Sequence, residues 1–286
     1  MIANFIDGLT NYQFLQNALI TSLLVGFVAG IIGSFIILRG MSLMGDAISH
    51  AVLPGVAISY MFGFSYVIGA SFFGVLTAVL IGFITEKSTL KNDTAIGIVF
   101  SSFFALGVIL ISFAQSATDL YHILFGNVLA VRDSDMMLTA VVTIVSLIFI
   151  LLFFKELKLT SFDPVMAKAA GLPVKFFHYA LMFLLTLVAV VSLQTVGTIL
   201  VISMLITPAA TAYLLTNNLK IMMCLSAFFG MFSSFIGLFF SYSYNLASGA
   251  TIVLTAAVFF VMAFLFAPQK GLLIRRKLEK NSEELV

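Results

Sequence analysis

The hydrophobic positions of this chain fall into long, nearly uninterrupted runs that are separated by short polar segments. Each run has about 20 residues, the length that a helix needs to cross a bilayer. The pattern predicts an all-α membrane protein with helices near residues 14–38, 42–62, 65–86, 93–115, 135–155, 176–194, 195–215, 221–243 and 248–267.

One of these nine runs is weaker than the others. The run from Thr195 to Thr216 follows its predecessor with almost no loop, and it contains the dipeptide Thr207-Pro208. Proline lacks a backbone donor and breaks helix interiors. We therefore interpret this run either as a full span or as a broken or re-entrant helix, and the predicted number of spans is eight or nine.

Composition supports the same class of protein. Of the 286 residues, 62% are hydrophobic and 9% are charged, and the mean hydropathy is +1.18, whereas soluble domains are only about half apolar. Because the apolar runs continue from end to end, we expect one membrane domain over residues 1–286 and no separate soluble domain. The single cysteine, Cys224, excludes an internal disulfide framework.

The basic residues fall almost entirely in alternate connections. Cytoplasmic loops collect lysine and arginine, and with nine spans and an external N-terminus, thirteen of the fourteen basic residues lie on the cytoplasmic side. Only Arg132 lies outside. The C-terminal tail, about residues 268–286, is then cytoplasmic. The thirteen basic residues on the cytoplasmic side are Arg39, Lys87, Lys91, Lys155, Lys158, Lys168, Lys175, Lys220, Lys270, Arg275, Arg276, Lys277 and Lys280.

Two ionisable residues interrupt the second apolar run. Asp46 and His50 are one helical turn apart, so they stack on one helix face. Counted from Arg39, they lie about 10 Å and 16 Å into the span. A charged group at the bilayer centre costs at least about 2.5–3.5 kcal/mol and normally faces an internal cavity.

Three interpretations of this pair remain open on spacing alone. A carboxylate and an imidazole can bind manganese, iron or zinc, they can form a proton relay, or they can satisfy each other as a structural hydrogen bond. One chain provides only two metal ligands here, which is too few. A twofold dimer with the site on its axis would double the set to two carboxylates and two imidazoles.

Two connections are longer than a turn. The external one, residues 114–135, contains Asp119 and His122, which could form a second metal-handling pair or a simply solvated one. The cytoplasmic one, residues 155–175, predicts a short helix near 161–172. Ser161 or Asp163 can cap it, Pro164 suits its first turn, and Gly171 ends it. Its apolar stripe, which includes Val165 and Met166, needs either the lipid surface or a cytoplasmic protein to cover it.

Missing motifs limit the possible activities. The chain has no G-x-x-x-x-G-K-[ST] phosphate loop, so any ATP must be hydrolysed by another polypeptide. It has no H-E-x-x-H motif, and Asp46 is the only acid predicted inside the membrane, which argues against an intramembrane protease. We therefore expect a transporter and not an enzyme. A secondary metal/proton transporter, which would work without an ATPase, is the alternative mechanism.

The run GMSLMGDAISHAVLPGVAISYMFG, residues 40–63, resembles the second-helix signature of the ABC-3 permeases, the membrane subunits of bacterial ABC importers for manganese, zinc and iron. Collinear matches cover almost the whole chain. The sequences of these segments are similar to those of manganese permeases of Gram-positive bacteria, although zinc permeases share the core motif. The further matches are DTAIGIVFSSFFALGVIL, ILFGNVLAV, SFDPVMAKAAGLPV, TVGTILVISMLITPAATAYLL and GATIVLTAAVFF.

The resemblance implies a multi-pass protein of the bacterial plasma membrane that imports a divalent metal, with Mn²⁺ favoured over Zn²⁺ or Fe²⁺, by alternating access. It implies a second copy of the chain, two cytoplasmic ATPase subunits and an extracellular metal-binding lipoprotein, besides membrane lipid. It makes Asp46 and His50 the metal ligands. It also makes the segment with Asp163, Ala167 and Gly171 the coupling helix for the ATPase. We expect no permanently bound cofactor and no nucleic-acid partner.

Overall fold

The computed structural model describes residues 2–114, 128–268 and 271–273, and the ordered elements in these ranges are all helices. The prediction of an all-α fold is confirmed. In chain order the helices are α1 (Ile2–Asn11), α2 (Gln13–Leu38), α3 (Leu43–Ala51), α4 (Leu53–Phe62), α5 (Tyr66–Lys87), α6 (Asn92–Ala114), the 3₁₀ turn η1 (Val128–Ala130), α8 (Asp133–Leu152), α9 (Phe154–Phe162), α10 (Pro164–Ala169), α11 (Val174–Val196), α12 (Thr198–Leu215), α13 (Leu219–Tyr244) and α14 (Ser248–Phe266).

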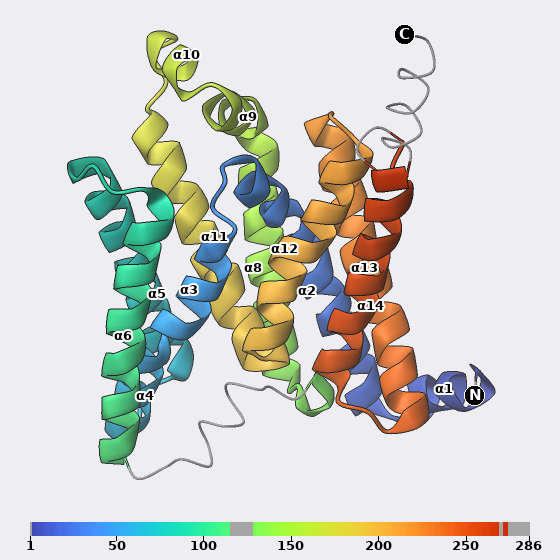
Figure 1. Cartoon of the computed structure of the whole chain (residues 1–286). Coiled ribbons are helices and arrows are strands. Elements are labelled where there is room, and N and C mark those ends of the chain that lie inside the picture. Colours follow the sequence, from blue (N-terminus) through green and yellow to red (C-terminus); the bar gives the residue numbers. More distant parts are fainter. Residues whose placement is uncertain (1, 115–127, 269–270, 274–286) are drawn as a thin grey trace, which may run out of the picture.

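Eight helices in the described part of the chain are long and apolar enough to cross a membrane, namely α2, α5, α6, α8, α11, α12, α13 and α14. The remaining crossing is made by α3 and α4 together, which carry the chain from one end of the bundle to the other between α2 and α5 (Figure 1). The predicted range of eight to nine spans is therefore confirmed, with the α3–α4 pair as the additional crossing.

The structure interrupts the second predicted span and not the run from Thr195 to Thr216. The run predicted as a candidate for a break or a re-entrant loop is one continuous helix, α12, with Pro208 in its interior. The interruption lies instead at Val52, between α3 and α4, where Pro54 occupies the first turn of α4. At that position the missing N–H is not needed, whereas neighbouring helices and Thr side chains help a membrane helix such as α12 to accommodate its proline.

The core of the bundle is the contact between α2 and α13. Their backbones approach so closely that a Cβ on Gly230 would lie 2.2 Å from the Gly26 carbonyl oxygen. Ser226 Oγ also donates a hydrogen bond across the contact to the Gly30 carbonyl at 2.7 Å. Lipid is as apolar as leucine, so close packing of small residues is what holds membrane helices together.

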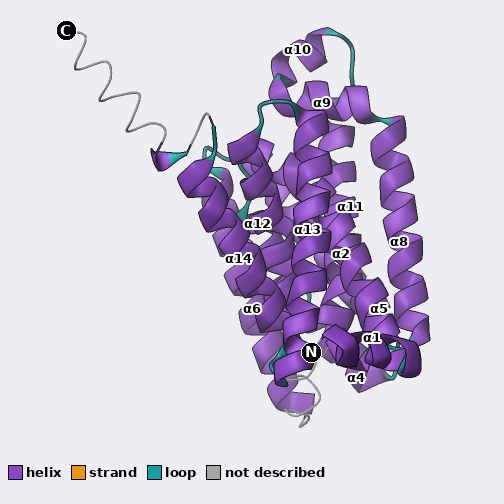
Figure 2. Ribbon diagram, turned by 90° about the vertical axis from the view of Figure 1, so that its right-hand side faces the viewer, coloured by secondary structure: helices purple, strands orange, loops and turns teal. Residues whose placement is uncertain are grey.

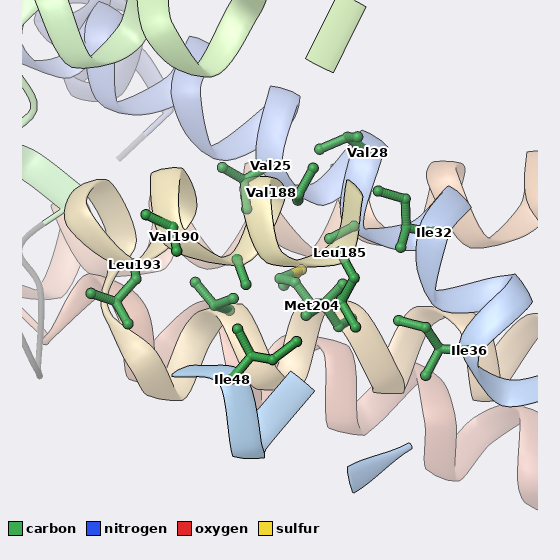
Figure 3. Close-up of a cluster of buried hydrophobic side chains, with 14 of the residues drawn as sticks. Val25, Val28, Ile32, Ile36, Ile48, Leu185, Val188, Val190, Leu193 and Met204 are labelled. Atoms are coloured by element: carbon green, nitrogen blue, oxygen red, sulfur yellow. The ribbon is translucent and has the colours of Figure 1, made fainter. Parts of the chain in front are cut away.

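A layer of buried aliphatic side chains surrounds this contact. Figure 3 shows Val25 and Ile32 of α2 close to Leu185 of α11, Met204 of α12 and Ile48 of α3. All five are nearly or completely inaccessible to solvent. Helix α3, which carries both candidate metal ligands, is therefore held on its inner side by the most buried part of the protein.

The two ends of the bundle differ in structure. Helices α9 and α10 lie across one end, and α1 lies across the other (Figures 1 and 2). Phe5 anchors α1 by packing on Phe235, Phe239 and Tyr242 of α13. The described basic residues assigned above to the cytoplasmic side lie in or next to helix termini at the α10 end, and Arg132 precedes α8 at the opposite end.

We predict that Gly230→Ala destabilises the protein, because the added methyl group meets the α2 backbone. Overpacking of this kind costs about 1–3 kcal/mol, and it should lower the midpoint of thermal unfolding of the purified chain. The matched control is Gly97→Ala in α6, where a Cβ would have no other atom within 4 Å. An equal midpoint for both variants would contradict the assigned α2–α13 contact.

Candidate metal site

Helix α3 starts from a sharp corner at the end of α2. Gly40 adopts the left-handed conformation there, with φ of 64°, and the Met41 N–H donates to the Ile36 carbonyl at 3.1 Å. The corner turns the chain back into the membrane. Helix α3, which lies near mid-height of the bundle in Figure 1, carries Asp46 in its first turn and His50 in its last turn.

Asp46 and His50 lie together, as the spacing predicted. His50 Nε2 is 3.5 Å from Asp46 Oδ1. Nitrogen and oxygen ligands bind ions such as zinc at about 2.0–2.2 Å, so two ligands of one ion can be at most about 4.2 Å apart. The pair is already within that limit, and one metal ion can contact both atoms without any movement of the α3 backbone.

The His50 ring is positioned by α6. The ring centroids of Phe100 and Phe104 each lie 5.8 Å from the His50 centroid. Helix α6 comes close because Gly107 has no side chain, and a Cβ there would be 2.7 Å from the Leu53 Cβ. Two aromatic walls and a glycine contact thus fix the imidazole and leave Nε2 directed towards Asp46.

The pair lies at the surface of the single chain. The side chain of Asp46 is 43% exposed and that of His50 is 27% exposed. In a membrane, an exposed side chain faces lipid, another protein or a water-filled cavity, and charged groups avoid lipid. Within the described residues no group of three or more His, Cys, Asp or Glu side chains could bind a metal ion. The ligand set of one chain is therefore incomplete.

The other predicted site residues belong to the external connection and to the predicted coupling helix. Asp119 and His122 lie outside the described residues. Asp163 caps α10, since its Oδ1 accepts from the Met166 N–H at 2.8 Å. Gly171 follows that helix with φ of 79°. Ala167 is completely buried, so it packs against its own chain and presents no side chain to a partner.

Sequence reasoning missed a polar network at the α10 end. Arg39 donates from Nε to Ser161 Oγ at 2.9 Å and from Nη2 to Thr160 Oγ1 at 3.0 Å, and its Nη1 is 3.4 Å from His178 Nδ1. Burial lowers the pKa of the Arg39 guanidinium to about 10, so it stays protonated at neutral pH. The network joins the corner before α3 to the end of α9 and the start of α11.

Helix α9 itself was also missed. The sequence predicted a single short helix near 161–172, whereas the structure divides this connection into α9 and α10, with Asp163 between them. A clue was present: Phe154, Leu157 and Ser161 follow a helical spacing before the proline. The sequence alone shows Arg39 only as a basic residue of a connection, because no local pattern predicts its hydrogen bonds to the distant hydroxyls of Thr160 and Ser161.

Comparison with known proteins decides the family. A model of the ABC 3 transport family matches residues 11–267, which is most of the chain and includes every described candidate residue. The chain belongs to the ABC 3 transport family. The resemblance found in the run around Asp46 and His50 is confirmed.

Relatives of this ABC 3 chain are similar over almost their full length. The "Manganese transport system membrane protein MntC" of Listeria monocytogenes is 66% identical over 275 residues, which are 96% of this chain and 98% of the relative. The "Manganese import system permease protein ScaB" of Streptococcus parasanguinis is 60% identical and covers 94% of this chain and 96% of the relative.

The fold also has a solved counterpart. "PsaBC from Streptococcus pneumoniae in complex with Fab" contains a chain with a TM-score of 0.86 and 61% sequence identity, covering 94% of this chain and 98% of that one. With eight spanning helices and such relatives, this ABC 3 chain is a multi-pass bacterial membrane protein.

Proposed function

We propose that this chain is the permease subunit of an ATP-driven importer and that it carries Mn²⁺ across the plasma membrane. The observation that carries the proposal is the Asp46–His50 pair, whose Nε2 and Oδ1 atoms lie 3.5 Å apart and whose side chains are partly exposed in the single chain. The names of the relatives support manganese. One carboxylate and one imidazole also suit zinc and iron, so the metal needs its own test.

A second copy of the chain completes the site. An exposed carboxylate against lipid costs at least about 2.5–3.5 kcal/mol, and the exposure of Asp46 leaves this cost unrelieved in a single chain. A twofold axis beside α3 places the same pair opposite itself. Two carboxylates and two imidazoles then surround one ion, and each chain covers the polar face of the other.

The energy source is a separate ATPase that docks at the α10 end. Three apolar side chains of this region are strongly exposed, Phe162 at 54%, Val165 at 80% and Met166 at 58%. They belong to the segment that the family resemblance identifies as the coupling helix. Exposed apolar side chains on a short amphipathic helix need a partner groove, and a pair of ATPase subunits below the dimer provides two such grooves.

The α10 end is the cytoplasmic one. Lysine and arginine collect on the cytoplasmic side of membrane proteins, and the described basic residues other than Arg132 lie at this end. In this orientation residues 1–286 form one membrane domain whose tail, from about residue 268, is cytoplasmic. The opposite end, with α1, receives the metal from an extracellular binding lipoprotein.

Transport follows from the connection between α10 and the metal ligands. Movement of α10 by the ATPases displaces α9, and the Arg39 hydrogen bonds pass this displacement to the corner that leads into α3. The Asp46–His50 ring then opens to one side of the membrane at a time. The ATPases bias the equilibrium because they contact the two states differently, since a partner with equal affinity for both states would shift nothing.

We predict that Asp46→Ala and His50→Ala each abolish manganese uptake, because each removes half of the ligand set, while the complex still assembles. Uptake is measured as cell metal content after growth rescue of a permease deletion, with manganese, zinc and iron supplied separately. Asp7→Ala, a change of an exposed acid on α1, is the control. Normal uptake by both site variants would refute the site assignment, and rescue by zinc alone would refute manganese.

A second prediction concerns the ATPase contact. Val165→Glu should prevent the ATPase subunits from copurifying with the permease, because it places a charge in an apolar interface. Val165→Ala retains an apolar surface and is the matched control. Since Val165 is 80% exposed, neither change should alter the unfolding midpoint of the isolated chain. Unchanged copurification of Val165→Glu would place the ATPase contact elsewhere.

A third prediction separates docking from coupling. Arg39→Met should leave the ATPase subunits bound but lower metal uptake roughly tenfold, the equivalent of one lost charged hydrogen bond. Lys87→Met, at an exposed lysine of the same end, is the control and should transport normally. Wild-type uptake by Arg39→Met would show that the Arg39 network does not transmit the movement.

A further inference from the structure

A groove runs along α13 on the outside of the bundle. The part of the groove nearer the α10 end, the upper part, is polar, and the part further from that end, the lower part, is apolar. We call it the α13 groove. Phe27 and Ile31 of α2 line its floor, Leu151 of α8 lines one wall, and Met223 and Met231 of α13 line the other. The volume of this part is about 730 Å³. It is large enough to take more than one side chain, and no described segment of the chain fills it.

The upper part of the groove is a polar cavity of about 540 Å³. Lys158 and Phe162 of α9 line one side of it, and Asn218 and Leu219 at the start of α13 line the other. Lys220, the next residue of α13, already belongs to the apolar part.

The two parts are adjacent, because Leu219 lines the polar part and its chain neighbour Lys220 lines the apolar part. Phe154, Lys158 and Phe162 are spaced by four residues, so they share one face of α9. Phe154 lines the apolar part, and the other two line the polar part. Lys220 Nζ lies 5.7 Å from the centroid of the Phe154 ring, which places an ammonium group where the two parts meet. The result is one groove with an apolar channel and a cationic head.

The length of the channel matches one leaflet of a bilayer. Lys220 and Met231 are both in α13, and eleven residues of helix span about 16 Å. Half of a hydrocarbon core is about 15 Å. An acyl chain that lies along α13 from Met231 therefore reaches headgroup level at Lys220. The groove has the dimensions of a lipid chain and not those of a second helix, which would need an unbroken face across the membrane.

The charge at the head of the groove is uncompensated. Neither Lys158 nor Lys220 forms an ion pair with any residue that the structure describes. The one acid of α9, Glu156, is two residues from both Phe154 and Lys158 and so lies on a different helix face. Two lysines without an acidic partner among the described residues, beside an apolar channel, favour a ligand with a negative head and a long apolar tail.

We propose that the α13 groove binds one anionic phospholipid, with an acyl chain along α13 and its phosphate between Lys158 and Lys220. Basic pockets between helices on the cytoplasmic side bind anionic headgroups. The bound lipid links α9 to α13 through its head. Because α9 also carries the Ser161 and Thr160 partners of Arg39, the lipid stabilises the helix that leads from α10 to the metal site.

The test is photocrosslinking with lipids that carry a diazirine on the acyl chain. The chain is purified with its accompanying partner proteins and placed in nanodiscs that contain the phosphatidylglycerol or the phosphatidylcholine probe. Crosslinks to the segment 223–231 are counted by mass spectrometry. Phosphatidylglycerol should label this segment more strongly, by roughly fivefold for each lysine that contacts the phosphate.

Three variants make the test specific. Lys158→Gln with Lys220→Gln should reduce phosphatidylglycerol labelling to the phosphatidylcholine level, and Lys87→Gln with Lys91→Gln, two exposed lysines at the same end, should leave it unchanged. Cys224→Phe adds bulk to an exposed residue that lines the channel, so it should lower labelling by both lipids. Unfolding midpoints show that each variant is folded.

Two results would overturn the proposal. Equal labelling by the two lipids, or labelling that the double lysine change does not reduce, would mean that the groove contains ordinary bilayer lipid only. Labelling of the isolated chain that disappears when the partner proteins are bound would mean that a protein surface occupies the head of the groove. Neither result would affect the assignment of Asp46 and His50, which is tested by metal uptake.

Discussion

A carboxylate and an imidazole one turn apart inside a membrane are the constraint on which the rest of this structure depends. In water Asp46 would need no partner, but in a membrane its exposed side chain must face protein or a water-filled path and not lipid. The chain does not cover it: His50 is 3.5 Å away, and no third ligand is present among the described residues. An exposed polar face in a membrane is costly, and we propose that a second copy of the chain covers this one and completes the metal path.

The rigidity around α3 and the break after it serve this site together. Glycine contacts bring α2 against α13, and Gly107 brings α6 against the α3–α4 junction. Packing of this kind leaves the backbone few alternatives, because any added atom would collide. Helix α3 ends at Ala51, one residue after His50, and α4 begins at Leu53; Val52 between them stays in the right-handed helical conformation, and Pro54 follows in the first turn of α4.

The α10 end concentrates the polar interactions that the membrane interior excludes. Arg39 connects three elements through hydroxyl and imidazole partners, and Lys175 pairs with Glu86 beside it. Charged residues are tolerated there because they reach the headgroup region, and the same lysines determine which way the protein inserts. The orientation of the protein, the proposed docking of the ATPases and the proposed lipid site thus all depend on the chemistry of this one end.

Much of this could be predicted without coordinates. Runs of about 20 apolar residues predict the spanning helices, a four-residue spacing places Asp46 over His50, and the Asp163-Pro164 pair predicts the start of α10, because each of these depends on residues that are close in the chain. Other features depend on residues that are far apart. Pro54 interrupts a span while Pro208 does not, and Arg39 finds its partners more than 120 residues away. The exposure of Asp46 and His50, the candidate metal ligands, also depends on distant residues, since a helix face is inside or outside only with respect to the helices that pack on its other faces. Local spacing determines which side chains share a helix face. Only the packing of the whole bundle determines whether that face meets the core, another helix or the surroundings of the protein.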